Sequence, residues 1–154
     1  MYESLVILHS WLRWLVLVMA LVAVGRAVRG KAAGTPWSSG DDAAGKWFVG
    51  SLDVQLLVGL ALYLFLSPYT MSAWSNMGEA MRNPVQRFMA IEHLVGMIIA
   101  IALAHIGRAR TRRATDPARR HKLALIFFGL ALVVILASIP WPFSSAGRPF
   151  IRGI

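Results

Sequence analysis

The stretch from Leu123 to Ile139 reads LALIFFGLALVVILASI and contains no ionisable side chain. A helix of roughly 20 apolar residues crosses the hydrocarbon core of a bilayer, which is about 30 Å thick. Pro140 and Pro142 follow directly and end the helix, because proline lacks the amide hydrogen that a continuing helix needs. The stretch therefore predicts a membrane-spanning helix over residues 122–139.

Three further stretches have the same apolar character, at residues 5–25, 47–66 and 85–106. A helix is expected in each, because it satisfies its own backbone hydrogen bonds without water. The chain of 154 residues is 57% hydrophobic and 15% charged, with a mean hydropathy of +0.60, which indicates lipid as the solvent. We expect one transmembrane domain, residues 1–154, of the all-α class: a four-helix transmembrane bundle.

The net charge of +9 is concentrated beside the apolar stretches and not on an amphipathic recognition helix, which argues against nucleic-acid binding. The segment between the second and third spans, 67–84, is nearly neutral, whereas the other two connecting segments are basic. By the positive-inside rule the basic segments are cytoplasmic and both termini lie on the outer, periplasmic side. The basic residues are Arg26, Arg29, Lys31 and Lys46 in the first segment and Arg108, Arg110, Arg112, Arg113, Arg119, Arg120 and Lys122 in the third.

Other residues agree with this orientation. Trp11, Trp14, Trp74 and Trp141 are expected to form an aromatic belt at the outer interface. The arginine-rich third segment either marks topology alone or also binds the headgroups of anionic lipids. The lipid bilayer is in both cases the first expected partner of the chain.

The absence of cysteine excludes disulfides, thiolate-bound iron–sulfur clusters and zinc, and covalently attached c-type haem. Ionisable side chains inside the spans then need an explanation, since an Asp or Arg at mid-depth costs roughly 2.5–3.5 kcal/mol on insertion scales. These residues are His9, Arg13, Asp53, Glu92, His93 and His105.

The two histidines His9 and His93 share a depth, because the first and third spans both enter from the outer side. Each heads a face of small residues, with Gly96 one turn after His93, and such a face allows a helix or a flat ligand to approach closely. Two imidazoles at one depth on facing helices suit axial ligation of haem b, with Arg13 available to a haem propionate or to Glu92. Alternatively, each histidine only hydrogen-bonds a carbonyl or Glu92.

A second metal or haem site involving Asp53, His105 and His121 is conceivable at the cytoplasmic half. The alternative is that Asp53 forms a salt bridge with Arg26, Arg108 or His105 and that His121 lies among the headgroups. Glu92 either serves a proton path or pairs with Arg13 or Arg87. Spacing alone leaves these alternatives open.

Four motifs carry a resemblance to a known family. The chain resembles a family of small bacterial four-span membrane proteins often labelled cytochrome b-like, which implies a bacterial inner-membrane location and b-type haem, with His9 and His93 as the matching histidines. Asp53 departs from the family pattern, which has a histidine there, so the resemblance implies no ligand from the second span. The motifs are HSWLRW at 9–14, QLLVGL at 55–60, EHLVGM at 92–97 and ASIPWPF at 137–143.

Two functions fit these observations. The first is a membrane-embedded electron-transfer protein or subunit that holds haem b between the first and third helices and exchanges electrons with quinone or with partner subunits. The alternative is a haem-free accessory or structural subunit of a larger respiratory or photosynthetic complex. A transporter or proton channel is disfavoured, because no span is interrupted at mid-membrane and no inverted repeat is visible.

Overall fold

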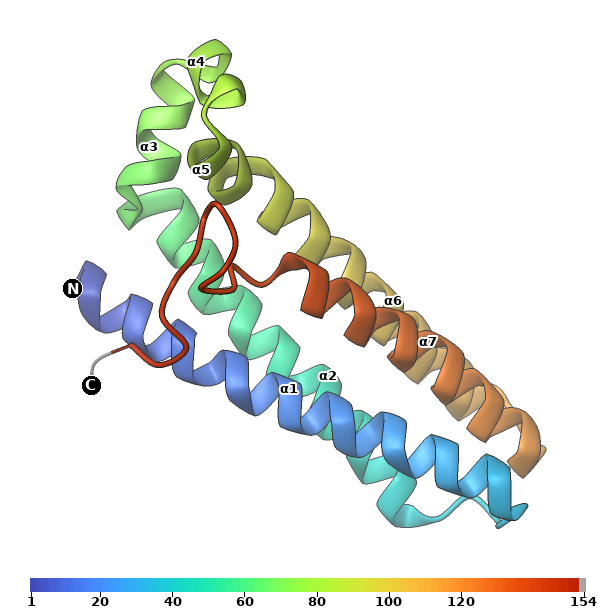
Figure 1. The fold of residues 1–154 in the computed structure, drawn as a ribbon. Helices are drawn as coiled ribbons and strands as arrows, with labels where there is room; N and C mark the ends of the chain where they lie inside the picture. Colours follow the sequence, from blue (N-terminus) through green and yellow to red (C-terminus); the bar gives the residue numbers. More distant parts are fainter. Residues whose placement is uncertain (153–154) are drawn as a thin grey trace.

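The computed structural model describes residues 1–152, and its regular structure is helical throughout. Four helical stretches are long and apolar enough to cross a membrane, which confirms the predicted four-span helical architecture (Figure 1). The helices are α1 (Tyr2–Ala33), α2 (Ser39–Ala61), α6 (His93–Arg113) and α7 (Pro117–Ser138), with a π-helical turn η1 (Leu62–Leu66) extending α2 and another, η2 (Phe88–Glu92), preceding α6.

The turn between α1 and α2, residues 34–38, is much shorter than the segment that separates the predicted spans 5–25 and 47–66. It begins at Gly34, whose φ of 62° is a left-handed conformation that ends α1. Ser38 then caps α2: its hydroxyl accepts from the Asp41 amide at 3.2 Å, and the Asp41 carboxylate accepts from the Ser38 amide at 2.8 Å. This reciprocal cap starts the helix well before the apolar stretch.

The segment predicted as a loop over residues 67–84 also folds into helices. They are α3 (Pro68–Ser75), α4 (Met77–Arg82) and α5 (Pro84–Arg87). The residues Ser67, Asn76 and Asn83 cap them, each accepting a hydrogen bond from a backbone amide in the first turn. These helices form one end of the molecule (Figure 1).

The core is made largely of alanines that let the four long helices approach one another closely. Helices α6 and α7, α1 and α2, and α1 and α7 pack extensively, whereas α2 and α6 make fewer contacts. Van der Waals packing of small residues is the main source of helix association in lipid. The buried alanines of the four long helices are Ala20, Ala23, Ala27, Ala44, Ala100, Ala104, Ala124 and Ala131.

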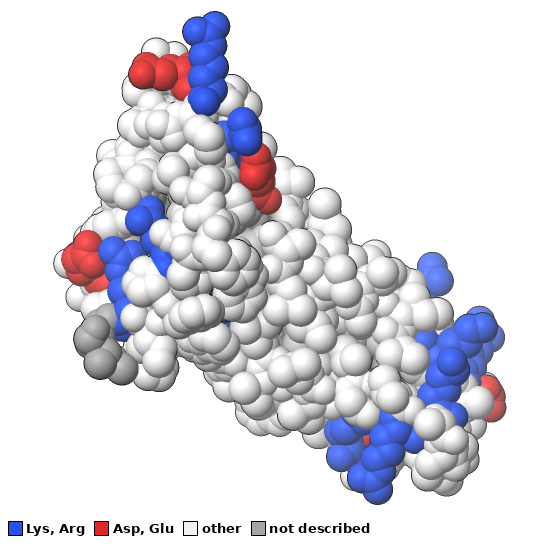
Figure 2. All heavy atoms as spheres, viewed as in Figure 1, with Lys and Arg blue, Asp and Glu red and all other residues white. Residues whose placement is uncertain are grey.

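The two ends of the bundle differ in charge (Figure 2). Lysines and arginines gather at the end that holds the turns 34–38 and 114–116, which we call the arginine end. We call the opposite end, with α3–α5, the start of α1 and the C-terminal segment 139–152, the pocket end; there Arg152 lies 3.5 Å from Glu3. A broad band without charged residues separates the ends on the face shown in Figure 2, as a bilayer environment requires.

Helix α1 is longer than the membrane is thick. Its 32 residues span about 48 Å at 1.5 Å per residue, against about 30 Å of hydrocarbon. Both ends of α1 therefore extend into the polar headgroup regions, which suits Glu3 in its first turn and Lys31 in its last turn.

Candidate functional site

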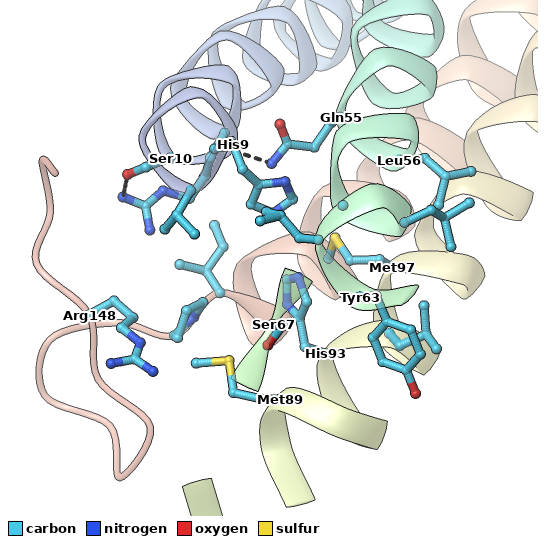
Figure 3. Close-up of a pocket in the computed structure, with 18 of the residues that line it drawn as sticks. His9, Ser10, Gln55, Leu56, Tyr63, Ser67, Met89, His93, Met97 and Arg148 are labelled. Carbon is cyan, nitrogen blue, oxygen red and sulfur yellow. Dashed lines mark hydrogen bonds between the residues drawn. The ribbon is translucent and has the colours of Figure 1, made fainter. Parts of the chain in front are cut away.

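A partly open cavity of about 200 Å³ lies at the pocket end, between α1, α2, α6 and the C-terminal segment. Most of its lining is apolar, as expected of a ligand site in which few polar groups fix orientation. Figure 3 shows His9 and His93 extending into this space from α1 and α6, with Tyr63 and Leu56 from the α2 side and Arg148 from the C-terminal segment. The principal polar lining residues are His9, Ser10, Arg13, Gln55, Tyr63, His93, Arg148 and Arg152.

The imidazoles of His9 and His93 face each other, as their shared depth predicted. Their ring centroids are 6.2 Å apart and their planes are inclined at 73°. Two imidazoles bound at about 2 Å on opposite sides of one metal ion also have centroids roughly 6 Å apart. The observed centroid separation is therefore short enough for both imidazoles to reach one metal ion.

His93 is held in a defined orientation by a hydrogen bond. Its Nδ1 lies 2.7 Å from the carbonyl oxygen of Ser138. Because a carbonyl can only accept, Nδ1 carries the proton and Nε2 keeps its lone pair. A metal-binding histidine commonly has this arrangement, in which a carbonyl fixes the tautomer and the ring direction.

Gly96 does not line the cavity, although the sequence suggested that it would. It affects instead the hydrogen bond between His93 and the Ser138 carbonyl. A Cβ at Gly96 would run into the hydroxyl of Ser138. The glycine therefore lets α6 approach α7, which brings His93 within reach of the Ser138 carbonyl. Its contribution to the site is through helix packing.

His9 is held by α2. The side-chain amide of Gln55 donates to the backbone carbonyl of His9 at 3.0 Å, and a Cβ at Gly59 would lie 3.1 Å from His9 Cε1. Nδ1 of His9 is buried without a hydrogen-bond partner among the described residues. An unpaired polar atom of this kind is uncommon in a native interior, and it marks the site as incomplete without a further group.

Two π-helical turns border the cavity. The hydroxyl of Tyr63 in η1 donates to the carbonyl of Ala90 in η2 at 2.8 Å, so the turns are joined to each other. Thr70 in α3 donates to the carbonyl of Tyr63 at 2.7 Å. Such turns shift the helix register locally and are frequent at functional sites; here they place Tyr63 and Met89 on the cavity wall.

The mouth of the cavity is basic. Arg13 donates to the backbone carbonyl of Phe150 at 2.6 Å, and its Nε is buried without a partner. Arg148 lies over the ring of Tyr69, with 4.7 Å between Cζ and the ring centroid. Of the two partners predicted for Glu92, the structure has Arg87, at 2.6 Å, and not Arg13. Arg13 remains at the cavity mouth.

Of the three residues considered for a second site, Asp53 and His105 meet, but His121 lies apart from them. Asp53 pairs with His105 at 2.8 Å, which is one of the salt bridges predicted as the alternative. His121 is buried, and not among the headgroups as that alternative had it; its ring packs against Trp37 at 5.0 Å and against Gly30. Within residues 1–152 no group of three or more His, Asp or Glu side chains is arranged to hold a metal ion.

The other two candidate partners of Asp53 are engaged elsewhere. Arg26 binds Asp41 at 2.9 Å, and Arg108 binds both oxygens of Asp42 at 2.6 and 2.9 Å. These pairs lie at the arginine end, where they fasten α1 and α6 to the start of α2.

The residues around the cavity fit a haem in their chemistry. Opposed imidazoles suit the iron of that group, and a mainly apolar wall suits its macrocycle. Basic side chains at the mouth suit its propionates. The cavity volume of about 200 Å³ is below the roughly 300–1,000 Å³ of most ligand pockets. Met89 and Met97, whose side chains are among the most flexible of the apolar residues, line its wall.

Several residues of the site were not predicted from the sequence. Gly59 lies four residues after Gln55, and this helical spacing could have placed both on the face toward α1. No local pattern indicates that the Ser138 carbonyl meets His93 or that Tyr63 and Arg148 line the cavity, because these positions result from the packing of distant segments.

Comparison of the chain with protein-family models, with curated proteins and with solved structures finds no match.

Proposed function

We propose that the protein is a membrane-embedded, b-type cytochrome-like electron-transfer protein in which His9 and His93 would hold one haem b. The observation that carries the proposal is the pair of opposed imidazoles, 6.2 Å apart, of which His93 is oriented by the Ser138 carbonyl. The resemblance of the four motifs to a cytochrome b-like family supports the same conclusion. The alternative function, a haem-free accessory subunit, accounts for the hydrogen bond between His93 and the Ser138 carbonyl but gives no role to the buried Nδ1 of His9, which has no partner among the described residues.

Each part of the cavity has a role in this proposal. His93 offers Nε2 as ligand, because its Nδ1 proton is bound by Ser138. His9 is the opposite ligand, and Gln55 holds its backbone in place. The apolar wall excludes water, and the guanidinium groups of Arg13 and Arg148 at the mouth bind carboxylates. When bound, haem b supplies reversible one-electron redox chemistry.

The proposal includes a location and an orientation. The apolar helices support a multi-pass membrane protein, and the family resemblance makes a bacterial inner membrane its proposed location. We infer from the basic turns that the arginine end is cytoplasmic and that the pocket end, with both termini, faces the periplasm. The histidine pair then lies in the outer leaflet, where quinone or a partner subunit is the proposed electron partner.

The experiment is absorbance spectroscopy of the protein made in a host with ample haem. We expect a Soret band and a low-spin reduced α-band in the wild type. His9→Ala and His93→Ala each remove one axial ligand, so they should give a high-spin spectrum or a folded protein without haem. His105→Ala and His121→Ala are the matched controls and should keep the α-band, since neither residue lines the cavity.

Folding of each variant is checked by helical circular dichroism and by a monodisperse elution in detergent. A wild type without Soret absorbance, or a folded His9→Ala variant with the wild-type spectrum, would overturn the proposal. The accessory-subunit function would then take its place, and copurifying subunits would identify the parent complex.

A further inference from the structure

A polar pair lies on the lipid-facing surface of the bundle. The side chains of Asp53 on α2 and His105 on α6 are 46% and 51% exposed, and their polar atoms are 2.8 Å apart. Asp53 is about 9 Å along α2 from Trp47, at 1.5 Å per residue, and is therefore inside the apolar band. A half-exposed Asp–His hydrogen bond facing lipid is unfavourable, since acyl chains offer its free polar atoms no partner.

The surroundings of this pair are small and apolar. Gly50 and Leu57 lie one turn to either side of Asp53, and Ala102 and Ala109 lie about one turn to either side of His105. A Cβ at Gly50 would meet nothing within 4 Å, and Leu57 is 68% exposed. We call these six residues the α2–α6 face. Small residues beside a polar group are the composition of helix interfaces in membranes.

The pair has unused hydrogen-bonding capacity. Only Nε2 of His105 and Oδ1 of Asp53 are bonded to each other. Among the described residues, Oδ2 of Asp53 and Nδ1 of His105 have no partner. In the ion-paired form these two atoms are an acceptor and a donor, so the face is complementary to a copy of itself turned by a two-fold rotation.

We propose that a second copy of this chain docks on the α2–α6 face, forming a two-fold symmetric dimer. In it Nδ1 of each His105 donates to Oδ2 of Asp53 in the other copy. Gly50, Ala102 and Ala109 allow the helices to approach closely enough for that contact. An unrelated partner would need both a donor and an acceptor at matching positions, whereas a second copy has them by symmetry. The weak packing of α2 against α6 leaves this surface open for it.

Cysteine cross-linking in native membranes tests the proposal, and the chain has no cysteine of its own. Leu57→Cys and Ala102→Cys place thiols on the α2–α6 face, and Leu21→Cys and Val133→Cys place them on exposed positions of α1 and α7 as controls. With a short bismaleimide linker, we expect covalent dimers from the first two variants only. Equal cross-linking at the controls, adducts with another protein, or no dimer at all would overturn the proposal.

A second measurement tests the role of the pair itself. The double variant Asp53→Leu/His105→Leu suits lipid and should fold, but it lacks the reciprocal hydrogen bonds. Its dimer dissociation constant, measured by energy transfer between labelled copies in vesicles, should rise about tenfold or more. The control is Leu21→Ala/Val133→Ala, which should change it less than about twofold. An unchanged constant in the first variant would show that the pair does not hold the dimer.

Discussion

The arginine end and the pocket end are built from the same four helices but are packed in opposite ways. Between the arginine end and the middle of the bundle, Phe48 and Phe128 meet edge to face with centroids 5.6 Å apart, and both are almost completely buried. Arg108 and Asp42 add a bidentate ion pair over this core. At the pocket end the helices separate around a cavity, and the backbone changes to π-helical turns.

Because they are packed differently, the two ends contribute differently to the stability of the protein. Closely packed aromatic rings and charge pairs contribute stability, whereas a cavity lowers it, because its wall atoms lack contacts on one side. An open region persists beside the histidine pair while the rest of the bundle is close-packed. We infer that the arginine end supplies most of the stability that the pocket end gives up.

The largest expected difference between the two ends is in how a cysteine placed at each end reacts with a reagent outside the cell. Thr115→Cys reports on the arginine end and Asn76→Cys on the pocket end. If the basic turns are cytoplasmic, an impermeant thiol reagent added to intact cells labels the cysteine at position 76 and not the one at position 115. Lysed cells are the control, in which both should react. The reverse pattern in intact cells would invert the orientation proposed for the whole bundle.

A second effect is in stability. Phe128→Ala should lower the free energy of unfolding by about 3 kcal/mol, because it removes a buried ring between the arginine end and the middle of the bundle. Met97→Ala, at the cavity wall, should cost less than about half of that, since its side chain already borders open space. Detergent-induced unfolding followed by circular dichroism measures both. Equal losses would mean that the two ends are packed equally well.

The smallest effect concerns a single methyl group. Gly30→Ala places a Cβ against the ring of His121, which is buried and also packed by Trp37, so a loss of about 1–2 kcal/mol is expected. Gly129→Ala is the control in α7: its Cβ would meet nothing within 4 Å. That variant should be neutral or more stable by up to about 1 kcal/mol, because alanine favours helix. Similar losses in both variants would point to a cause other than contact with His121.

The four spans and the facing histidines could be predicted because each follows from a local property. Span length follows from apolar runs, and the position of His9 opposite His93 follows from counting residues inward from one membrane surface. The pairing of Asp53 with His105 was among the predicted partners for a similar reason, since a carboxylate in a span needs a cation nearby. The depth of a residue in the membrane and the need of a charged residue for a partner can therefore be predicted from the sequence.

The starts of three helices also have a local signal in the sequence. Ser67-Pro68 and Asn83-Pro84 each place a capping residue before a proline, which is a common helix start, and they begin α3 and α5. The spacing of Ser38 and Asp41 likewise matches a capping box and begins α2. Connecting segments in this chain are short because these caps extend the helices.

The rest could not be predicted because it arises from long-range packing. Arg13 binds the carbonyl of Phe150 only because the C-terminal segment folds back over α1. The π-helical turns beside Tyr63 and Ala90 have no residue signature of their own, and the hydrogen bond between them depends on how α2 and α6 meet. Contacts between residues this far apart require the complete fold.

The position of Phe150 has a consequence for how the protein is made. Its carbonyl accepts hydrogen bonds from Arg13 and from Trp14, at 2.6 and 2.9 Å, and so ties the C-terminal segment across the mouth of the cavity. During translation, His9 and His93 are both synthesised before this segment. At about 5–20 residues per second, the ribosome needs several seconds to travel from His93 to Phe150. For that interval the nascent chain has both imidazoles but neither the Ser138 carbonyl that orients His93 nor the C-terminal residues that complete the cavity wall.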